Sequence, residues 1–165
     1  MGRHLTLETD SMASHIPVNH PLRPIYRVVG FIAGAYLVVF GVLGAIQTAG
    51  EPFANETGIR VLGQETNMLS SLIHIVFGGL VLAATAIGKN LDVAVDKYLG
   101  WTMLVLGSYA LATIRTDANF FGYSMSTVIV TYLAGLLLIT VSLYSKIVPD
   151  SQAGAPRQVR EGRTA

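Results

Sequence analysis

Four long stretches of the chain contain no Asp, Glu, Lys or Arg residue, and their positions predict the architecture. A membrane-spanning helix needs about 20 mostly apolar residues, within a range of about 17–25. Because backbone polar groups have no water to bond inside lipid, such stretches are predicted to be helices. The pattern predicts an all-α, four-helix membrane bundle with helices at about 28–48, 68–87, 97–115 and 125–147.

The two ends of the chain are polar and are predicted to lie outside this bundle. Residues 1–27 form an N-terminal tail and residues 148–165 a C-terminal tail predicted to be disordered, so the transmembrane domain covers 28–147. The first apolar stretch begins too far from Met1, and is too long, for a cleavable signal peptide. We therefore expect the first helix to stay in the membrane.

Composition supports the membrane prediction and excludes several classes of function. Hydrophobic residues make up 52% of the chain and charged residues 13%, against about 25% in a typical soluble domain. The net charge of +1 gives no broad basic surface, so no nucleic-acid partner is expected. Cysteine is absent, which excludes disulfides, thiolate metal sites and a cysteine nucleophile.

The basic residues are unevenly divided between the two sides of the predicted membrane. Nine of the eleven Lys and Arg residues lie in the two tails and in the loop between the second and third helices. The other two are Arg60 and Arg115, in the first and third loops. Basic residues concentrate on the cytoplasmic side, so both termini are predicted to be cytoplasmic and the first loop, which carries Glu51, Glu56 and Glu65, to face outward.

Small residues gather on one side of the first helix. Four glycines fall within about 80° of one another at 100° per residue, and small residues let helix backbones approach closely in lipid. The stripe fits packing within the chain, and it also fits a seam between copies in a homo-oligomer. The glycines predicted to pack helices are Gly30, Gly34, Gly41, Gly44, Gly78 and Gly135.

Polar residues form stripes on the second, third and fourth helices, and these faces are unsuited to lipid. One interpretation is that the hydroxyls bond preceding carbonyls or neighbouring helices and hold the bundle together. The alternative is a hydrated cavity or substrate path. The candidate intramembrane polar site consists of Asn67, Ser70, Ser71, His74, Tyr109 and Thr131.

His74 is the one strongly polar ionisable side chain that falls within a predicted span. Ionisable groups in a membrane interior are rare and often functional. The other three histidines lie in the N-terminal tail, which disfavours a bis-histidine haem site. No Asp or Glu falls within a predicted span, which disfavours a proton relay. We expect His74 to be satisfied structurally, by Tyr109 or Ser70.

A weak two-helix repeat is visible in the sequence. The segment 34–36 of the first helix, Gly-Ala-Tyr, resembles Gly-Ser-Tyr at 107–109 in the third helix. In the second and fourth helices, the spacing of Met68, His74 and Gly78 matches that of Met125, Thr131 and Gly135. The match indicates two repeated helical hairpins.

The segment 67–79, NMLSSLIHIVFGG, resembles the family called domain of unknown function 4383, small four-helix membrane proteins found mainly in actinobacteria. Asn67, His74 and Gly78 match the family pattern. Ser70 and Ser71 stand where the family often has His and Asn, and Thr131 stands where it often has a further His. The resemblance implies this architecture and a bacterial inner membrane, but no activity.

Three hypotheses about function follow. The first is a non-enzymatic scaffold or accessory subunit, with the lipid bilayer and a homo-oligomer or larger membrane complex as partners. The second is a small transporter or channel-forming oligomer that uses the polar face around His74. The third is a quinone- or haem-associated redox subunit. No catalytic, metal-binding or cofactor-binding residue is predicted.

Overall fold

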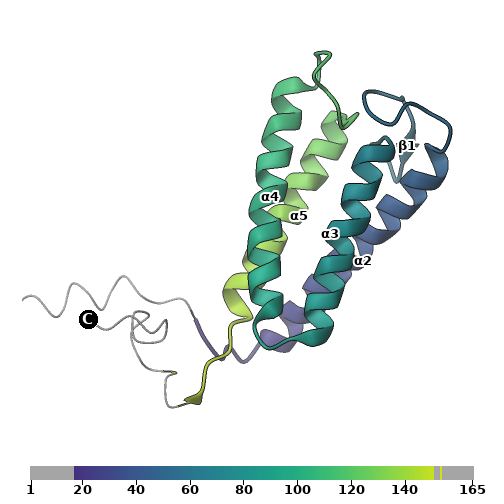
Figure 1. The fold of residues 1–165 in the computed structure, drawn as a ribbon. Coiled ribbons are helices and arrows are strands. Elements are labelled where there is room, and N and C mark those ends of the chain that lie inside the picture. The colour runs from purple at the N-terminus through teal and green to yellow at the C-terminus, as the bar shows by residue number, and fades with distance from the viewer. Residues whose placement is uncertain (1–16, 151–152, 154–165) are drawn as a thin grey trace, which may run out of the picture.

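The computed structural model describes residues 17–150 and Ala153. Most of the two predicted tails, residues 1–16, 151–152 and 154–165, lies outside the described residues. The described chain folds into four long helices and almost no strand, so the predicted all-α four-helix bundle is confirmed (Figure 1). The helices are α2 (Arg23–Gln47), α3 (Met68–Ile87), α4 (Leu91–Thr113) and α5 (Met125–Tyr144).

A small strand pair lies in the loop that joins α2 to α3. Strands β1 (Arg60–Val61) and β2 (Gln64–Glu65) pair antiparallel, with Arg60 opposite Glu65. The turn between them uses Leu62 and Gly63, both at positive φ, as tight hairpins require. This loop and the α4–α5 loop cover the same end of the bundle, here called the loop end (Figure 1). The opposite end, where α2 begins and α5 finishes, is called the terminal end.

Three of the described helices, α2, α3 and α5, are long and apolar enough to cross a membrane. Helix α4 is less apolar because its first turns carry Asp92, Asp96 and Lys97, yet it runs beside α5 for most of its length (Figure 1). All four helices expose large apolar side chains, such as Ile32, Val76, Val105 and Leu133. A surface of this kind is typical of a protein surrounded by lipid.

The helix boundaries differ from the predicted ones at the terminal end. Helix α2 starts at Arg23, five residues before the predicted position 28, and Pro24 occupies its first turn, where a missing N–H costs nothing. Helix α4 starts at Leu91, six residues before the predicted position 97. The prediction used charges to delimit the spans, whereas here the charged side chains are accommodated inside helices.

The helices associate as two hairpins, α2 with α3 and α4 with α5, each closed by a glycine contact. A Cβ added to Gly78 would lie 2.6 Å from the Gly34 carbonyl oxygen, so the two backbones touch. In the second hairpin, a Cβ added to Gly135 would lie 2.9 Å from the Gly100 carbonyl oxygen. Small residues therefore set the closest approach in both hairpins.

The two hairpins bury equivalent positions, which fits the predicted repeat but changes its register. All seven buried positions of α3 recur in α5, where His74 corresponds to Thr131 and Gly78 to Gly135, as the sequence match proposed. In the first helix of each hairpin, Gly34 corresponds to Gly100 and not to Gly107, a shift of two helical turns. The equivalent buried pairs of α2 and α4 are Gly30 and Asp96, Gly34 and Gly100, Leu37 and Met103, Gly41 and Gly107, and Gly44 and Ala110.

The centre of the bundle is a layer with one large apolar side chain from each helix. We call Leu37, Val81, Met103 and Leu138 the apolar layer, and each is at most 2% exposed. The four form a single core cluster with Ala33. Because Leu37 and Met103 are equivalent in the repeat, as are Val81 and Leu138, the layer is where the two hairpins meet most symmetrically.

Candidate functional site

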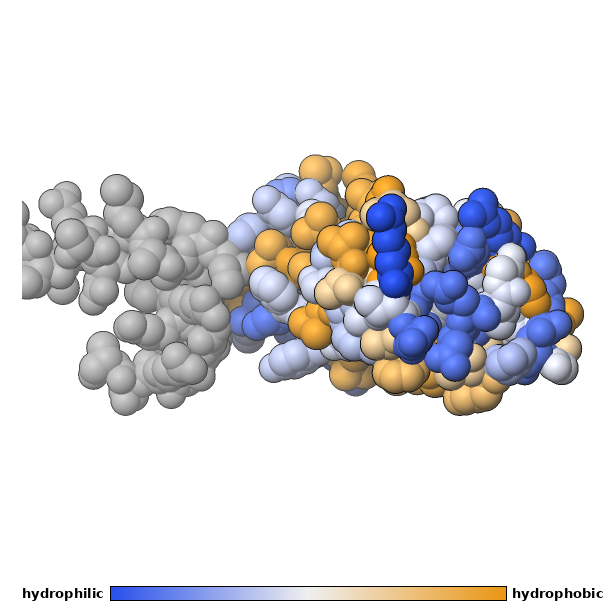
Figure 2. Space-filling view, turned by 90° about the horizontal axis from the view of Figure 1, so that it is seen from above, coloured by the Kyte–Doolittle hydropathy of each residue, from blue (hydrophilic) through white to orange (hydrophobic). Residues whose placement is uncertain are grey.

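The buried polar groups of the bundle fall into two clusters, one at each end, separated by the apolar layer. The loop end, seen from above in Figure 2, gathers hydrophilic residues over the helix ends. It contains most of the candidate intramembrane site. The terminal end holds a second cluster that the sequence analysis did not identify.

Asn67 closes the loop end by joining three segments. Its side-chain oxygen accepts a hydrogen bond from the Ser70 backbone N–H at 2.9 Å and so caps α3. Its amide nitrogen donates to the carbonyl oxygens of Asn55, at 2.9 Å, and Phe120, at 2.8 Å. Both amide donors and the acceptor are thus used within the chain, and one residue ties α3 to the two loops above it.

The two serines of the candidate site bond a neighbouring threonine. Thr66 Oγ1 lies 2.6 Å from Ser70 Oγ and 3.0 Å from Ser71 Oγ. Ser70 Oγ also accepts from the Asn67 backbone N–H, which completes a capping box. The side chain of Ser71 faces Gly44 of α2, where a Cβ would collide with the serine hydroxyl. These hydroxyls stabilise the first turn of α3 and its contact with α2.

His74 is buried and bonds to its own helix. Its Nδ1 lies 2.7 Å from the Ser70 carbonyl oxygen, so this nitrogen carries the proton and donates. Of the two partners the sequence suggested, Ser70 is the one observed, through its backbone. The ring packs edge-on against Phe40, with centroids 4.9 Å apart, and lies 6.1 Å from the ring of Tyr123. The surroundings of His74 are therefore largely aromatic.

Among the described residues, neither Thr131 nor Tyr109 makes a hydrogen bond to His74. Thr131 Oγ1 donates to the Thr127 carbonyl oxygen at 2.8 Å, one helical turn back, as His74 does to Ser70 in the equivalent position. Tyr109 donates to the Ala118 carbonyl oxygen at 2.7 Å, in the α4–α5 loop. The six candidate residues therefore split into a cluster at the start of α3 and two separate side chains.

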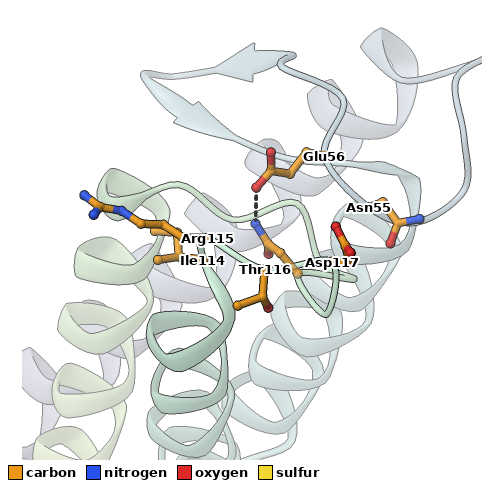
Figure 3. Close-up of a pocket in the computed structure, with 7 residues that line it drawn as sticks. Asn55, Glu56, Ile114, Arg115, Thr116 and Asp117 are labelled. Carbon is orange, nitrogen blue, oxygen red and sulfur yellow. Dashed lines mark hydrogen bonds between the residues drawn. The ribbon is translucent and has the colours of Figure 1, made fainter.

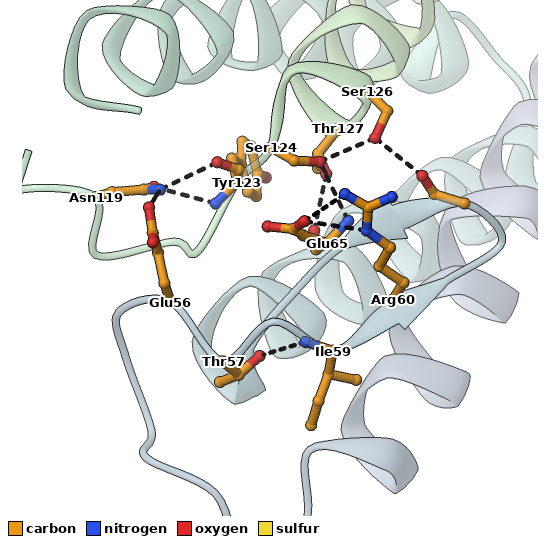
Figure 4. Close-up of polar contacts among 11 residues, drawn as sticks. Glu56, Thr57, Ile59, Arg60, Glu65, Asn119, Tyr123, Ser124, Ser126 and Thr127 are labelled. Carbon is orange, nitrogen blue, oxygen red and sulfur yellow. Dashed lines mark hydrogen bonds and ion pairs between the residues drawn. The ribbon is translucent and has the colours of Figure 1, made fainter. Parts of the chain in front are cut away.

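The first turn of α5 is bound to the β1–β2 segment (Figure 4). Thr127 Oγ1 donates to the Glu65 carbonyl oxygen at 2.8 Å, and Ser126 Oγ donates to the Gly63 carbonyl oxygen at 2.9 Å. The Glu65 carboxylate accepts from Arg60 at 2.7 Å. These bonds join the loop of the first hairpin to the second hairpin, so the loop end behaves as one connected cap.

A second tie between the loops runs through Asn119. Its amide nitrogen donates to Glu56 Oε1, at 2.9 Å, and to the Tyr123 carbonyl oxygen, at 3.0 Å, while its oxygen accepts from the Tyr123 N–H (Figure 4). Tyr123 is 1% exposed, and burial raises the pKa of its hydroxyl above the ordinary value. Burial beneath the cap therefore favours the neutral hydroxyl.

A polar cavity opens between these two loops (Figure 3). Its volume is about 720 Å³, within the usual range for ligand sites. Glu56 and Asn119 are hydrogen-bonded at its wall, and the exposed side chains of Arg115 and Asp117 lie at its edge. Its lining residues carry carboxylate, amide and guanidinium groups.

The packing glycines mostly serve contacts within the chain. Gly34 and Gly41 of α2 face α3, where a Cβ at Gly41 would lie 2.6 Å from the Ser71 carbonyl oxygen. Gly30 faces the second hairpin instead, with Val141 and the Asp96 carboxylate beside it. The glycine stripe of α2 is therefore in contact with other helices of the same chain.

The terminal end holds two arginines and two buried aspartates. The Asp92 carboxylate lies 3.3 Å from Arg27 Nε and 3.5 Å from Arg23, which also donates to the Ser145 carbonyl oxygen at 2.8 Å. Asp96 is 1% exposed, and its Oδ1 has no hydrogen-bond partner among the described residues. The expectation that no acid enters a helical span is corrected here, because α4 carries both aspartates and arginines of α2 pair with Asp92.

The sequence does contain a signal for this cluster. Arg23 and Arg27 are four residues apart, as are Asp92 and Asp96, and this spacing places each pair on one face of a helix. Sequence reasoning missed them because it treated charges as boundaries of spans. Within the described part of the chain, no three His, Asp or Glu side chains are grouped closely enough to hold a metal ion.

Comparison with known proteins gives a family but no characterised relative. No curated protein and no solved structure matches the chain. One family model, described as domain of unknown function (DUF4383), matches residues 27–144, which include α3, α4, α5 and all of α2 except its first four residues. The match covers well over half of the chain and agrees with the resemblance seen in the segment 67–79. The chain therefore belongs to the DUF4383 family.

Proposed function

We propose that this membrane protein is a non-enzymatic scaffold or accessory subunit that presents a rigid polar cap to a partner. The observation that carries the proposal is the apolar layer. Its four side chains fill the bundle between the loop-end polar cluster and the terminal-end charges. A close-packed apolar layer offers no hydrogen bonds to water or to a polar solute, which argues against a path through the monomer.

The use of the polar side chains supports the same proposal. Asn67, Ser70, His74 and Thr131 bond to backbone or hydroxyl groups of the chain itself. A transport path needs polar groups that can exchange partners with a passing solute. In this bundle those groups instead fix helix ends and loops, which is what a stable cap requires.

The proposed placement is the bacterial plasma membrane with the loop end outside. The terminal end carries Arg23, Arg27, Lys89 and Lys146, and basic residues favour the cytoplasmic side. The loop end exposes the acids Glu51, Glu56 and Asp117, which suits a partner with a basic surface. Both termini would then be cytoplasmic.

The proposal is tested by reversing charge on the cap and, separately, by removing the polar side chains below it. We expect Glu51→Lys with Asp117→Lys to reduce recovery of associated polypeptides from native membranes without lowering the thermal stability of the purified bundle. His74→Leu with Thr131→Leu should leave that recovery unchanged. If the second pair alone abolishes the cellular phenotype, the scaffold proposal is wrong.

A second candidate function, proton-linked transport, is favoured by one observation. Asp96 is buried with an unpartnered carboxylate oxygen, and buried acids in membrane proteins often carry protons. The apolar layer separates Asp96 from His74, so this candidate needs the layer to open. Measuring proton uptake into proteoliposomes distinguishes transport from the scaffold function. Uptake that is lost in Asp96→Asn supports transport. No uptake by the unmodified protein supports the scaffold.

A further inference from the structure

A groove follows the seam where α2 meets α5, the contact that joins the two hairpins on one side. Its volume is about 510 Å³. Ala33 is its most deeply buried wall residue, at 7% exposure, while Ile32 and Leu133 stand on either side at 60% and 61%. The groove is lined by Ile32, Ala33 and Tyr36 from α2 and by Leu133, Ala134 and Leu137 from α5, among others.

The repeat shows which residues leave this groove open. The equivalent seam lies between α4 and α3, where Leu99 takes the place of Ala33 and Phe77 the place of Ala134. Both larger side chains pack against the core cluster. The bundle thus fills one seam with its own side chains and leaves the other lined by two alanines.

The uneven exposure of the lining residues favours a hydrocarbon chain over another helix. Packed helices have axes about 8–10 Å apart, and a helix with its side chains is about 10–12 Å across. Because Ala33 is far less exposed than Ile32 and Leu133, a helix from a second copy would contact these two residues first. An unbranched hydrocarbon chain is thinner than a helix and suits the space over Ala33 better.

The chemistry of the walls points the same way. The lining side chains are aliphatic except for Tyr36, whose hydroxyl already accepts a hydrogen bond from Gln64 at the loop end. The groove offers no charged or amide side chain to a polar ring or head group. It is also continuous with the exposed apolar surface of α2 and α5, which the bilayer surrounds.

We propose that the α2–α5 groove binds one acyl chain of a membrane phospholipid and holds it as part of the structure. The acyl chain occupies the space that the Leu99 and Phe77 side chains occupy in the α3–α4 seam. It completes the contact between the hairpins without a polar anchor. This inference does not depend on the proposed scaffold function.

The first test measures phospholipid retained by the full-length protein after purification in detergent and extensive washing. The unmodified protein is expected to retain about one phospholipid per chain. Ala33→Leu with Ala134→Phe, which copies the filled seam, should lower retention about tenfold because the added side chains occupy the site. The matched control, Ala83→Leu with Ala94→Phe, adds the same groups at exposed alanines and should retain lipid normally.

A second test needs no substitution and therefore holds even if the filled variant fails to fold. The unmodified protein is reconstituted with a phospholipid that carries a photoreactive group in its acyl chain, and the crosslinked peptides are identified. Crosslinks concentrated on α2 and α5 around Ala33 and Ala134 support the proposal. Equal crosslinking at Val76 and Val105, retention of an isoprenoid quinone, or a chain-to-chain crosslink at Leu133 would overturn it.

Discussion

The two hairpins share one buried framework but fill it differently, and the differences account for most of the features that distinguish the ends and seams of this bundle. At equivalent positions the first hairpin has Gly30 and the second Asp96, and the first has His74 where the second has Thr131. The shared positions specify how the helices pack. The unshared ones place a charge cluster at the terminal end and a groove on one side.

The comparison also shows how a helical repeat builds an asymmetric molecule. Gly30 leaves space beside the Asp96 carboxylate, which approaches the backbone of α2 where a larger residue would stand. One acid of the second hairpin, Asp92, pairs with two arginines of the first. The first hairpin therefore supplies the arginines of the charge cluster, and the second supplies the aspartates.

The largest expected difference between the hairpins concerns two equivalent glycines. Gly41→Ala places a Cβ 2.6 Å from the Ser71 carbonyl oxygen, and we expect a loss of about 2–3 kcal/mol in the free energy of unfolding. Gly107→Ala meets only the Tyr132 ring, at 3.5 Å, and should change stability by less than about 0.5 kcal/mol. Equilibrium unfolding in mixed micelles measures both. Equal losses would mean that the hairpins are packed alike.

The charge cluster provides the next test, because it joins the hairpins to each other. Asp92→Ala leaves two partly buried arginines without their carboxylate. We therefore expect the free energy of unfolding to fall by about 2 kcal/mol. The control Lys89→Ala removes an exposed charge at the same end and should cost less than about 0.5 kcal/mol. If Asp92→Ala leaves the free energy of unfolding unchanged, the association of the two hairpins does not depend on this contact.

The helix caps at the loop end should show a smaller contrast. Asn67→Ala removes the cap of α3 and two bonds to the loops, with an expected cost of about 1.5 kcal/mol. Ser124, at the equivalent position before α5, makes no side-chain cap bond and bonds only neighbouring hydroxyls and, weakly, the Glu65 N–H, so Ser124→Ala should cost about 0.5 kcal/mol. Hydrogen exchange of the first turns of α3 and α5 reports the two effects separately. A larger effect at α5 contradicts the assigned capping.

The smallest expected effect tests whether His74 is structural. His74→Thr introduces the residue found in the second hairpin, which can make the same bond to the carbonyl one turn back. We expect a loss of about 1 kcal/mol, from lost ring packing, and no change in cellular phenotype. A preserved fold with a lost phenotype would instead identify His74 as functional.

The sequence predicted the four helices, because an uncharged apolar stretch depends on local composition. Uncharged stretches identify spans, and glycines such as Gly34 and Gly78 stand out in apolar sequence. The partner of His74 was one of two alternatives, since a histidine in a helix can always reach the carbonyl four residues earlier. The register of the repeat was wrong for the first helices, because a three-residue match resembles many segments of apolar sequence.

The terminal-end cluster and the α2–α5 groove were not predicted, and the reason is physical. Asp92 and Asp96 look like the end of a span until Arg23 and Arg27 are known to face Asp92 from another helix. The groove forms because α2 and α5 meet and small residues from both helices lie at the same level of that contact. Such long-range coincidences leave no trace in a hydropathy pattern.

The most direct test of the central claim, a sealed apolar layer between two polar ends, is cysteine labelling of this cysteine-free chain. Single cysteines at Glu51, Val81 and Lys89 are exposed to a membrane-impermeant maleimide, first in intact cells and then in opened membranes. We predict that Glu51→Cys labels in intact cells, Lys89→Cys only in opened membranes, and Val81→Cys only after denaturation. Labelling of Val81→Cys in native membranes would mean that water reaches the layer, and would contradict the account.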